Sequence, residues 1–96
     1  MATVILPRSL LDLFPGLGKR HELAGDDVAA LIAALDALAP GLRDRLVEEG
    51  PRLRPHINVF VAGQPAALDT PVRAGDTVHV IPAVSGGSGR RRAPSG

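Results

Sequence analysis

A segment near the middle of the chain carries apolar residues at steps of three and four, namely Val28, Leu31, Ile32, Leu35 and Leu38. This spacing predicts a helix with one apolar face. Asp26 precedes the segment and is expected to cap the first amide groups, while Asp27 favours the positive end of the helix. Pro40 and Gly41 indicate where the helix ends.

Alternating apolar and polar positions predict a strand later in the chain. In "HINVFVAG" the residues Ile57, Val59 and Val61 alternate with Asn58, Phe60 and Ala62, which is the period of a strand. Gly63 and Gln64 are expected to turn the chain. A final strand is expected over 77–84, which is strongly β-branched as far as Pro82.

The remaining elements are predicted from shorter patterns. The run 3–6 is β-branched and ends at Pro7, which indicates a first strand, and 19–23 is expected to return beside it as a polar edge strand. Between them, 9–18 resembles a turn with apolar residues under it. Leu42 and Leu46 have helical spacing and predict a second short helix before Pro51, and a brief edge strand is expected near Leu68.

The order strand, strand, helix, short helix, strand, short strand, strand predicts an α+β fold of the β-grasp (ubiquitin-like) type. One main helix would cross a small mixed sheet. If that helix covers Ile57, Val59, Val61, Val78 and Val80, alternation sends Phe60, His79 and Ile81 to the opposite face. An exposed apolar cluster there would be a docking surface. The alternatives are that a loop covers Phe60 or that the last strand has the other phase.

Composition limits the fold to one small domain. The chain has 96 residues, of which 45% are hydrophobic, yet only Phe14 and Phe60 are aromatic. The core is therefore expected to consist of Val, Ile, Leu and Ala, which favours a scaffold over a deep aromatic-lined pocket. No stretch approaches the roughly 20 apolar residues of a membrane span, and the start lacks a secretory signature. A cytoplasmic protein without membrane association is expected.

The chain offers few groups for catalysis. The absence of cysteine excludes disulfides and thiol nucleophiles. The histidines, His21, His56 and His79, lack metal-ligand spacing, and no serine has an evident base partner. No metal site, cofactor or catalytic residue is predicted. Arg90, Arg91 and Arg92 are expected to be solvated, so no nucleic-acid partner is predicted.

The segment Gly75 to Gly87, "GDTVHVIPAVSGG", resembles the ending of the ThiS/MoaD family of sulfur carriers, in which a β-branched strand and a Pro-containing linker precede a terminal Gly-Gly. "HINVFVAGQ" also resembles the central strand and turn of that family. The likeness covers 1–87, which we predict to be the carrier domain. It implies the β-grasp fold and a function that depends on the C-terminus rather than on a pocket.

The resemblance implies that Gly87 is adenylated with ATP by a ubiquitin-activating-type adenylyltransferase and then converted to a thiocarboxylate that donates sulfur. Ser85, Gly86 and Gly87 would thread a narrow passage in that partner, because glycine has no Cβ. The carrier would have no enzymatic activity of its own. The acceptor would be a cysteine synthase-like enzyme or the large subunit of molybdopterin synthase, with thiamine synthesis ranked third.

One feature departs from the family pattern. Carriers in their active form end at the diglycine, whereas Ser88 to Gly96, "SGRRRAPSG", follow it here. Gly87 is then an amide and cannot be adenylated. We expect 88–96 to be a disordered basic extension, and we hypothesise that a deubiquitinase-type metalloprotease cuts between Gly87 and Ser88. The alternative is a cloning remnant or a misassigned stop.

Two other functions remain open. The chain could be a β-grasp interaction module in which "SGGSG" is only a linker. It could also be a protein modifier that is conjugated through Gly87 to lysines of other proteins. Loss of function on removal of Gly86 and Gly87 would argue against the first alternative, and isopeptide adducts would favour the second.

Overall fold

The computed structural model describes residues 1–82. The predicted tail residues Ser85, Gly86, Gly87 and Ser88, and the extension 88–96, lie outside this part of the chain. The elements in chain order are β1 (Ala2–Ile5), α1 (Arg8–Leu13), β2 (Arg20–Leu23), α2 (Val28–Leu38), α3 (Leu42–Leu46), β3 (Val47–Glu48), β4 (Arg52–Leu53), β5 (Ile57–Val61), β6 (Gln64–Ala66) and β7 (Thr77–Pro82).

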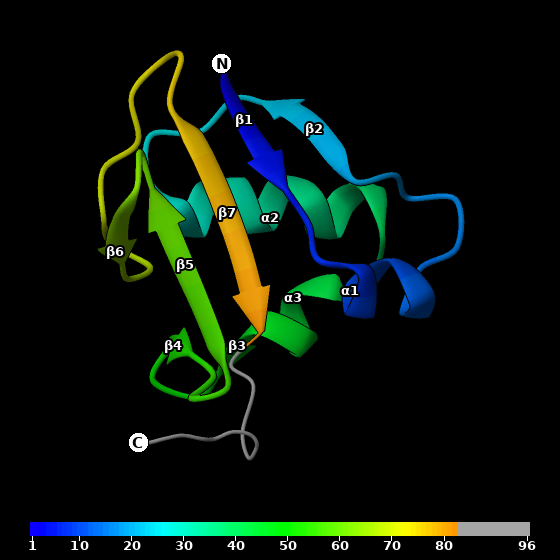
Figure 1. The fold of residues 1–96 in the computed structure, drawn as a ribbon. Helices are drawn as coiled ribbons and strands as arrows, with labels where there is room; N and C mark the ends of the chain where they lie inside the picture. The colour runs from blue at the N-terminus through cyan, green and yellow to red at the C-terminus, as the bar shows by residue number, and fades with distance from the viewer. Residues whose placement is uncertain (83–96) are drawn as a thin grey trace, which may run out of the picture.

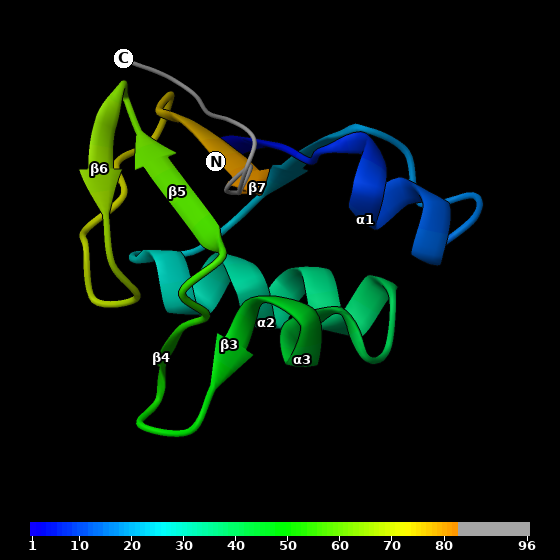
Figure 2. The same cartoon turned by 60° about the horizontal axis from the view of Figure 1, so that its bottom comes forward.

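A five-stranded sheet forms one layer of the molecule and α2 forms most of the other (Figures 1 and 2). The strand order is β2-β1-β7-β5-β6. β1 and β7 run parallel in the centre, and the other pairs are antiparallel. This mixed sheet crossed by one main helix is the predicted α+β, β-grasp arrangement.

The core lies between the two layers. From α2 it receives Val28, Leu31, Ile32 and Leu35, each at most 3% exposed. From the sheet it receives the inward-facing valines of β5 and β7 and Val4 of β1. α3 adds Leu42 and Leu46, which close one end of the core. Leu38 was predicted to share the apolar face of α2, but it is 57% exposed.

The start of α2 differs from the prediction by one residue. Asp27, rather than Asp26, is the N-cap, and its Oδ1 accepts a hydrogen bond of 2.8 Å from the amide of Ala30. Asp27 has extended backbone angles, as an N-cap requires. Asp26 is exposed, and its carbonyl accepts a hydrogen bond from the amide of Val72.

Four short elements were not predicted or were misplaced. Residues 8–13 form the helix α1 instead of a turn, and only Leu10 of this helix is buried. β3 and β4 form a small antiparallel hairpin after α3. The edge strand β6 lies at Gln64–Ala66, before Leu68. The turn that precedes it is Ala62 and Gly63, both with positive φ.

Candidate functional site

Within residues 1–82 no helix covers the sheet face opposite α2, and one row of side chains crosses all five strands on it. The register pairs Arg20 with Ile5, Ile5 with His79, His79 with Phe60, and Phe60 with Pro65. Directly paired residues project to the same face of a sheet. We call this row, together with Ile81, the sheet face. In Figure 1 the sheet lies in front of α2, so this face is turned toward the viewer.

The predicted alternation on β5 and β7 is confirmed. Val78 and Val80 are buried, whereas His79 and Ile81 are exposed, Ile81 by 43%. Phe60 is half-buried on its strand, between two buried valines. The last strand therefore has the predicted phase, and Phe60, His79 and Ile81 share a face. Their role in docking stays a prediction.

Ile5, Pro65 and Arg20 belong to the same face but were not predicted from the sequence. Their placement depends on strand order and register, which bring β1 and β6 next to β7 and β5. For Ile5 there was a partial indication in the sequence, because the β-branched run 3–6 predicted a strand there. In the structure Val4 of this strand is buried and Ile5 is half-buried. The sequence pattern alone did not specify which strand would lie beside β7.

The edge of the sheet face at β2 is polar. The Thr3 hydroxyl donates a hydrogen bond of 2.7 Å to Glu22 Oε2, and Arg20 Nε lies 3.7 Å from the same oxygen. Both charged side chains of this ion pair are more than half exposed. The apolar centre of the face therefore has a charged border, as protein interfaces commonly do.

The strand that leads to the diglycine is held on both sides. β7 pairs with β1 over three residues and with β5 over five, and the last pair joins Ile57 to Pro82. Because β7 is hydrogen-bonded on both sides, it is a rigid point of attachment for the C-terminal segment. Gly87 is only five residues beyond Pro82 in the sequence.

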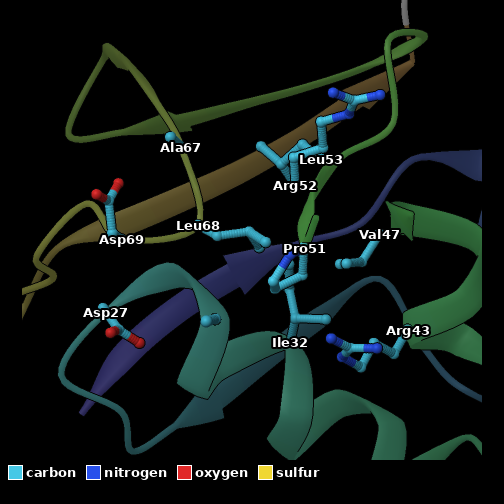
Figure 3. Close-up of a pocket in the computed structure, with 11 residues that line it drawn as sticks. Asp27, Ile32, Arg43, Val47, Pro51, Arg52, Leu53, Ala67, Leu68 and Asp69 are labelled. Atoms are coloured by element: carbon cyan, nitrogen blue, oxygen red, sulfur yellow. The ribbon is translucent and has the colours of Figure 1, made fainter. Parts of the chain in front are cut away.

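A groove of about 410 Å³ lies on the other side of the molecule, between α2, the β3–β4 hairpin and the segment after β6 (Figure 3). Its floor is apolar and includes Ile32, Leu53 and Leu68. Carboxylates stand at one end and arginines at the other. Residues 1–82 contain no group of three or more His, Cys, Asp or Glu side chains that could hold a metal ion. Within the same range, none of the helices has the length and apolar character to span a membrane.

Comparison with known proteins gives consistent matches. The model of the ThiS family matches residues 13–87. Small archaeal modifier protein 1 of Haloferax volcanii is 41% identical over 71 residues, which cover 71% of this chain and 79% of that protein. The sulfur carrier protein CysO of Mycobacterium tuberculosis is 31% identical over 91 residues, covering 88% of this chain and 97% of that protein.

The solved structures agree in fold. A chain of the BexX/CysO complex of Amycolatopsis orientalis superposes with a TM-score of 0.79 at 33% identity, covering 91% of this chain and 100% of that chain. The proteins that match are small carriers and modifiers, and their similarity extends over nearly the whole described fold.

Proposed function

The chain belongs to the ThiS family of ubiquitin-like carrier and modifier proteins, and on this premise we propose that it carries sulfur as a thiocarboxylate on Gly87. The match to the family model ends at Gly87, which is the observation that carries the proposal. It supports a functional domain of residues 1–87 that ends in the diglycine, with 88–96 as an additional segment.

The chemistry needs a free carboxylate at Gly87. That carboxylate would attack the α-phosphorus of ATP, release pyrophosphate and form an acyl-adenylate. A sulfur nucleophile would then displace AMP and leave the thiocarboxylate. The partner supplies ATP and the catalytic groups, so the chain itself is a substrate. This role suits a sequence without cysteine, because the sulfur is held on the backbone terminus.

The geometry of β7 supports delivery of the terminus into another protein. A fully extended stretch of five residues spans at most about 17 Å, so Gly87 can reach a nucleotide that lies within this distance of Pro82. Ser85, Gly86 and Gly87 carry little or no side chain, which allows a narrow passage. Ordering each glycine costs about 0.5–1 kcal/mol more than ordering alanine, so docking of the body must offset this cost.

We assign that docking to the sheet face. His79 and Ile81 lie on β7, the strand that leads to Gly87, and Phe60 pairs with His79 from β5, so a partner that binds them would also receive the terminus. The proposed partners are a ubiquitin-activating-type adenylyltransferase and a sulfur-acceptor enzyme, either cysteine synthase-like or the large subunit of molybdopterin synthase. That CysO was crystallised in a complex with BexX supports a mode of action through partner proteins.

The segment that follows Gly87 requires a processing step. We propose that a deubiquitinase-type metalloprotease cuts the bond between Gly87 and Ser88. The test compares the chain of 96 residues with a chain that ends at Gly87, each incubated with ATP, a sulfide source and the host's adenylating enzyme. Only the shorter chain should gain the mass of one oxygen-to-sulfur exchange. Equal thiocarboxylate formation on both chains would contradict the proposal.

A second candidate function is protein modification. It is favoured by the 41% identity to small archaeal modifier protein 1. In this case the activated Gly87 would form isopeptide bonds with lysines of target proteins. Mass spectrometry of trypsin-treated host proteins would then show lysines that carry a branch derived from the end of this chain. A carrier without modifier activity would yield thiocarboxylate and no such adducts.

A further inference from the structure

The outward face of α2 lacks charged side chains. Ala29, Ala33 and Ala37 are exposed on this face at intervals of four residues. The single charged residue of α2 is Asp36, whose Oδ1 accepts hydrogen bonds from the amides of Gly41 and Arg43 at 3.1 and 3.0 Å. Helices that cover a core normally present charged residues to solvent. An apolar outer face is typical of a helix that meets another protein surface.

The groove shown in Figure 3 continues this face on one flank of α2, because Ala29 and Ile32 also line it. Asp69 lies at one end of the groove and Arg43 at the other. Both side chains are exposed, and neither has an ion pair within residues 1–82. Arg52, which also lines the groove, is paired with Glu48 at 2.8 Å. Asp27 also lines the groove and caps α2 through the amide of Ala30. The groove side chains without an ion pair within residues 1–82 are therefore the carboxylates of Asp27 and Asp69 at one end and the guanidinium of Arg43 at the other.

The side chains of Asp69 and Arg43 lie at different levels along α2. Asp69 is beside the first turn, since the carbonyl of Leu68 accepts a hydrogen bond of 2.9 Å from the amide of Ala29. Arg43 is beside the third turn, because its amide is bound to Asp36. Seven residues separate Ala29 from Asp36, which corresponds to about 10 Å of helix. The face therefore has a negative end and a positive end on the same flank.

We propose that this face binds a second copy of the chain, with the two α2 helices antiparallel and Ala33 near the two-fold axis. In an antiparallel two-fold pair the groove flank of one copy lies against the groove flank of the other. The two flanks run in opposite directions along the helices. Asp69 of one copy then meets Arg43 of the other, twice. A parallel pair would not bring these opposite ends together. The small alanine side chains allow the helices to approach closely, and the interface is closed and self-complementary.

The pair would leave the proposed carrier function intact. α2 and the sheet face lie on opposite sides of the molecule (Figure 2), so both sheet faces and both β7 strands stay accessible. The interface is independent of Gly87, and the dimer would present two termini for loading.

Sedimentation equilibrium of the full chain over a concentration series tests the proposal. The wild-type chain should reach the mass of two copies. Asp69→Arg and Arg43→Asp should each raise the dimer dissociation constant by more than about tenfold, because like charges then meet across the interface. The double variant that carries both changes, or an equimolar mixture of the two single variants, should dimerise again.

Matched controls distinguish the loss of specific interface contacts from a general effect of changed net charge on dimerisation. Asp12→Arg and Arg8→Asp make the same changes on α1, which lies outside this face, and should leave dimerisation unaltered. Ala33→Glu should abolish it, whereas Ala74→Glu in the loop before β7 should not. A wild-type chain that stays monomeric at every concentration would overturn the proposal. A dimer that persists in Ala33→Glu and in both single charge reversals would also overturn it.

Discussion

Asp27 stabilises the start of α2 through one hydrogen bond to the amide of Ala30. Replacing Asp27 with Ala leaves that amide without its partner, and loss of such a cap costs about 1 kcal/mol of stability. Urea unfolding should therefore show a lower midpoint for Asp27→Ala. Asp26→Ala is the matched control, because the Asp26 side chain is exposed and accepts no hydrogen bond within residues 1–82. Equal losses in the two variants would contradict the assignment of the cap.

Ala62 is held in a left-handed conformation. Its φ is 50° and that of Gly63 is 83°, and the two residues join β5 to β6 in a two-residue turn of the kind that favours Asn-Gly. The left-handed region costs about 1–2 kcal/mol for an ordinary residue, and Asn tolerates it better. Ala62→Asn should therefore raise the free energy of unfolding by up to about 1 kcal/mol.

The opposite change tests the same conformation. Ala62→Val should lower the free energy of unfolding, because a β-branched side chain crowds the backbone in the left-handed region. Since Ala62 is exposed, neither variant should alter packing. If Asn and Val at this position gave the same stability, the turn could not have the positive φ described.

Long periodic patterns predicted α2, β5 and β7, and shorter patterns also predicted β1, β2 and α3. Other short segments gave no such signal. α2, β5 and β7 each carry enough apolar positions to fix their type and buried face from the sequence. α1 has six residues and buries only Leu10, so it has no repeated apolar positions from which a helix could be predicted. The strands β3 and β4 have two residues each, too few for an alternation to be visible. For the sheet face, Phe60, His79 and Ile81 followed from alternation, whereas Ile5 and Pro65 required the register.

The sheet face should contribute to partner binding separately from the chemistry at Gly87. Ile81 lies near the end of β7 and is 43% exposed, so Ile81→Arg should change stability by less than about 1 kcal/mol. In adenylation of a chain that ends at Gly87, this variant should raise KM by more than about tenfold, because it places a charge in an apolar contact. The value of kcat should change little, since the reacting terminus is the same.

A control on another surface separates docking from net charge. Ser9→Arg adds the same charge on α1, where Ser9 is exposed, and should leave KM unaltered. If Ile81→Arg and Ser9→Arg behaved alike, the sheet face would not be the docking surface. If Ile81→Arg lowered kcat with no change in KM, the residue would act after binding instead.

At the scale of the whole molecule, folding and the proposed function depend on different parts of the chain. Residues 1–82 already contain the helices, all five strands of the main sheet and the buried core between these layers. A chain that ends at Ser85 should thus unfold at the same urea midpoint as one that ends at Gly87. It should form no acyl-adenylate, because no glycine carboxylate reaches the nucleotide.

The shortened chain should nevertheless inhibit the reaction of the longer one. Its sheet face is complete, so it should compete for the docking surface of the adenylating enzyme. The inhibition constant should lie within about tenfold of the KM of the active carrier. The difference between the two constants reflects the contacts that Gly86 and Gly87 would have made. Steady-state adenylation measured against both chains gives this constant. Ile81→Arg in the shortened chain should remove the inhibition. Absence of inhibition by the unaltered shortened chain would mean that binding resides in the terminal residues and not in the folded body.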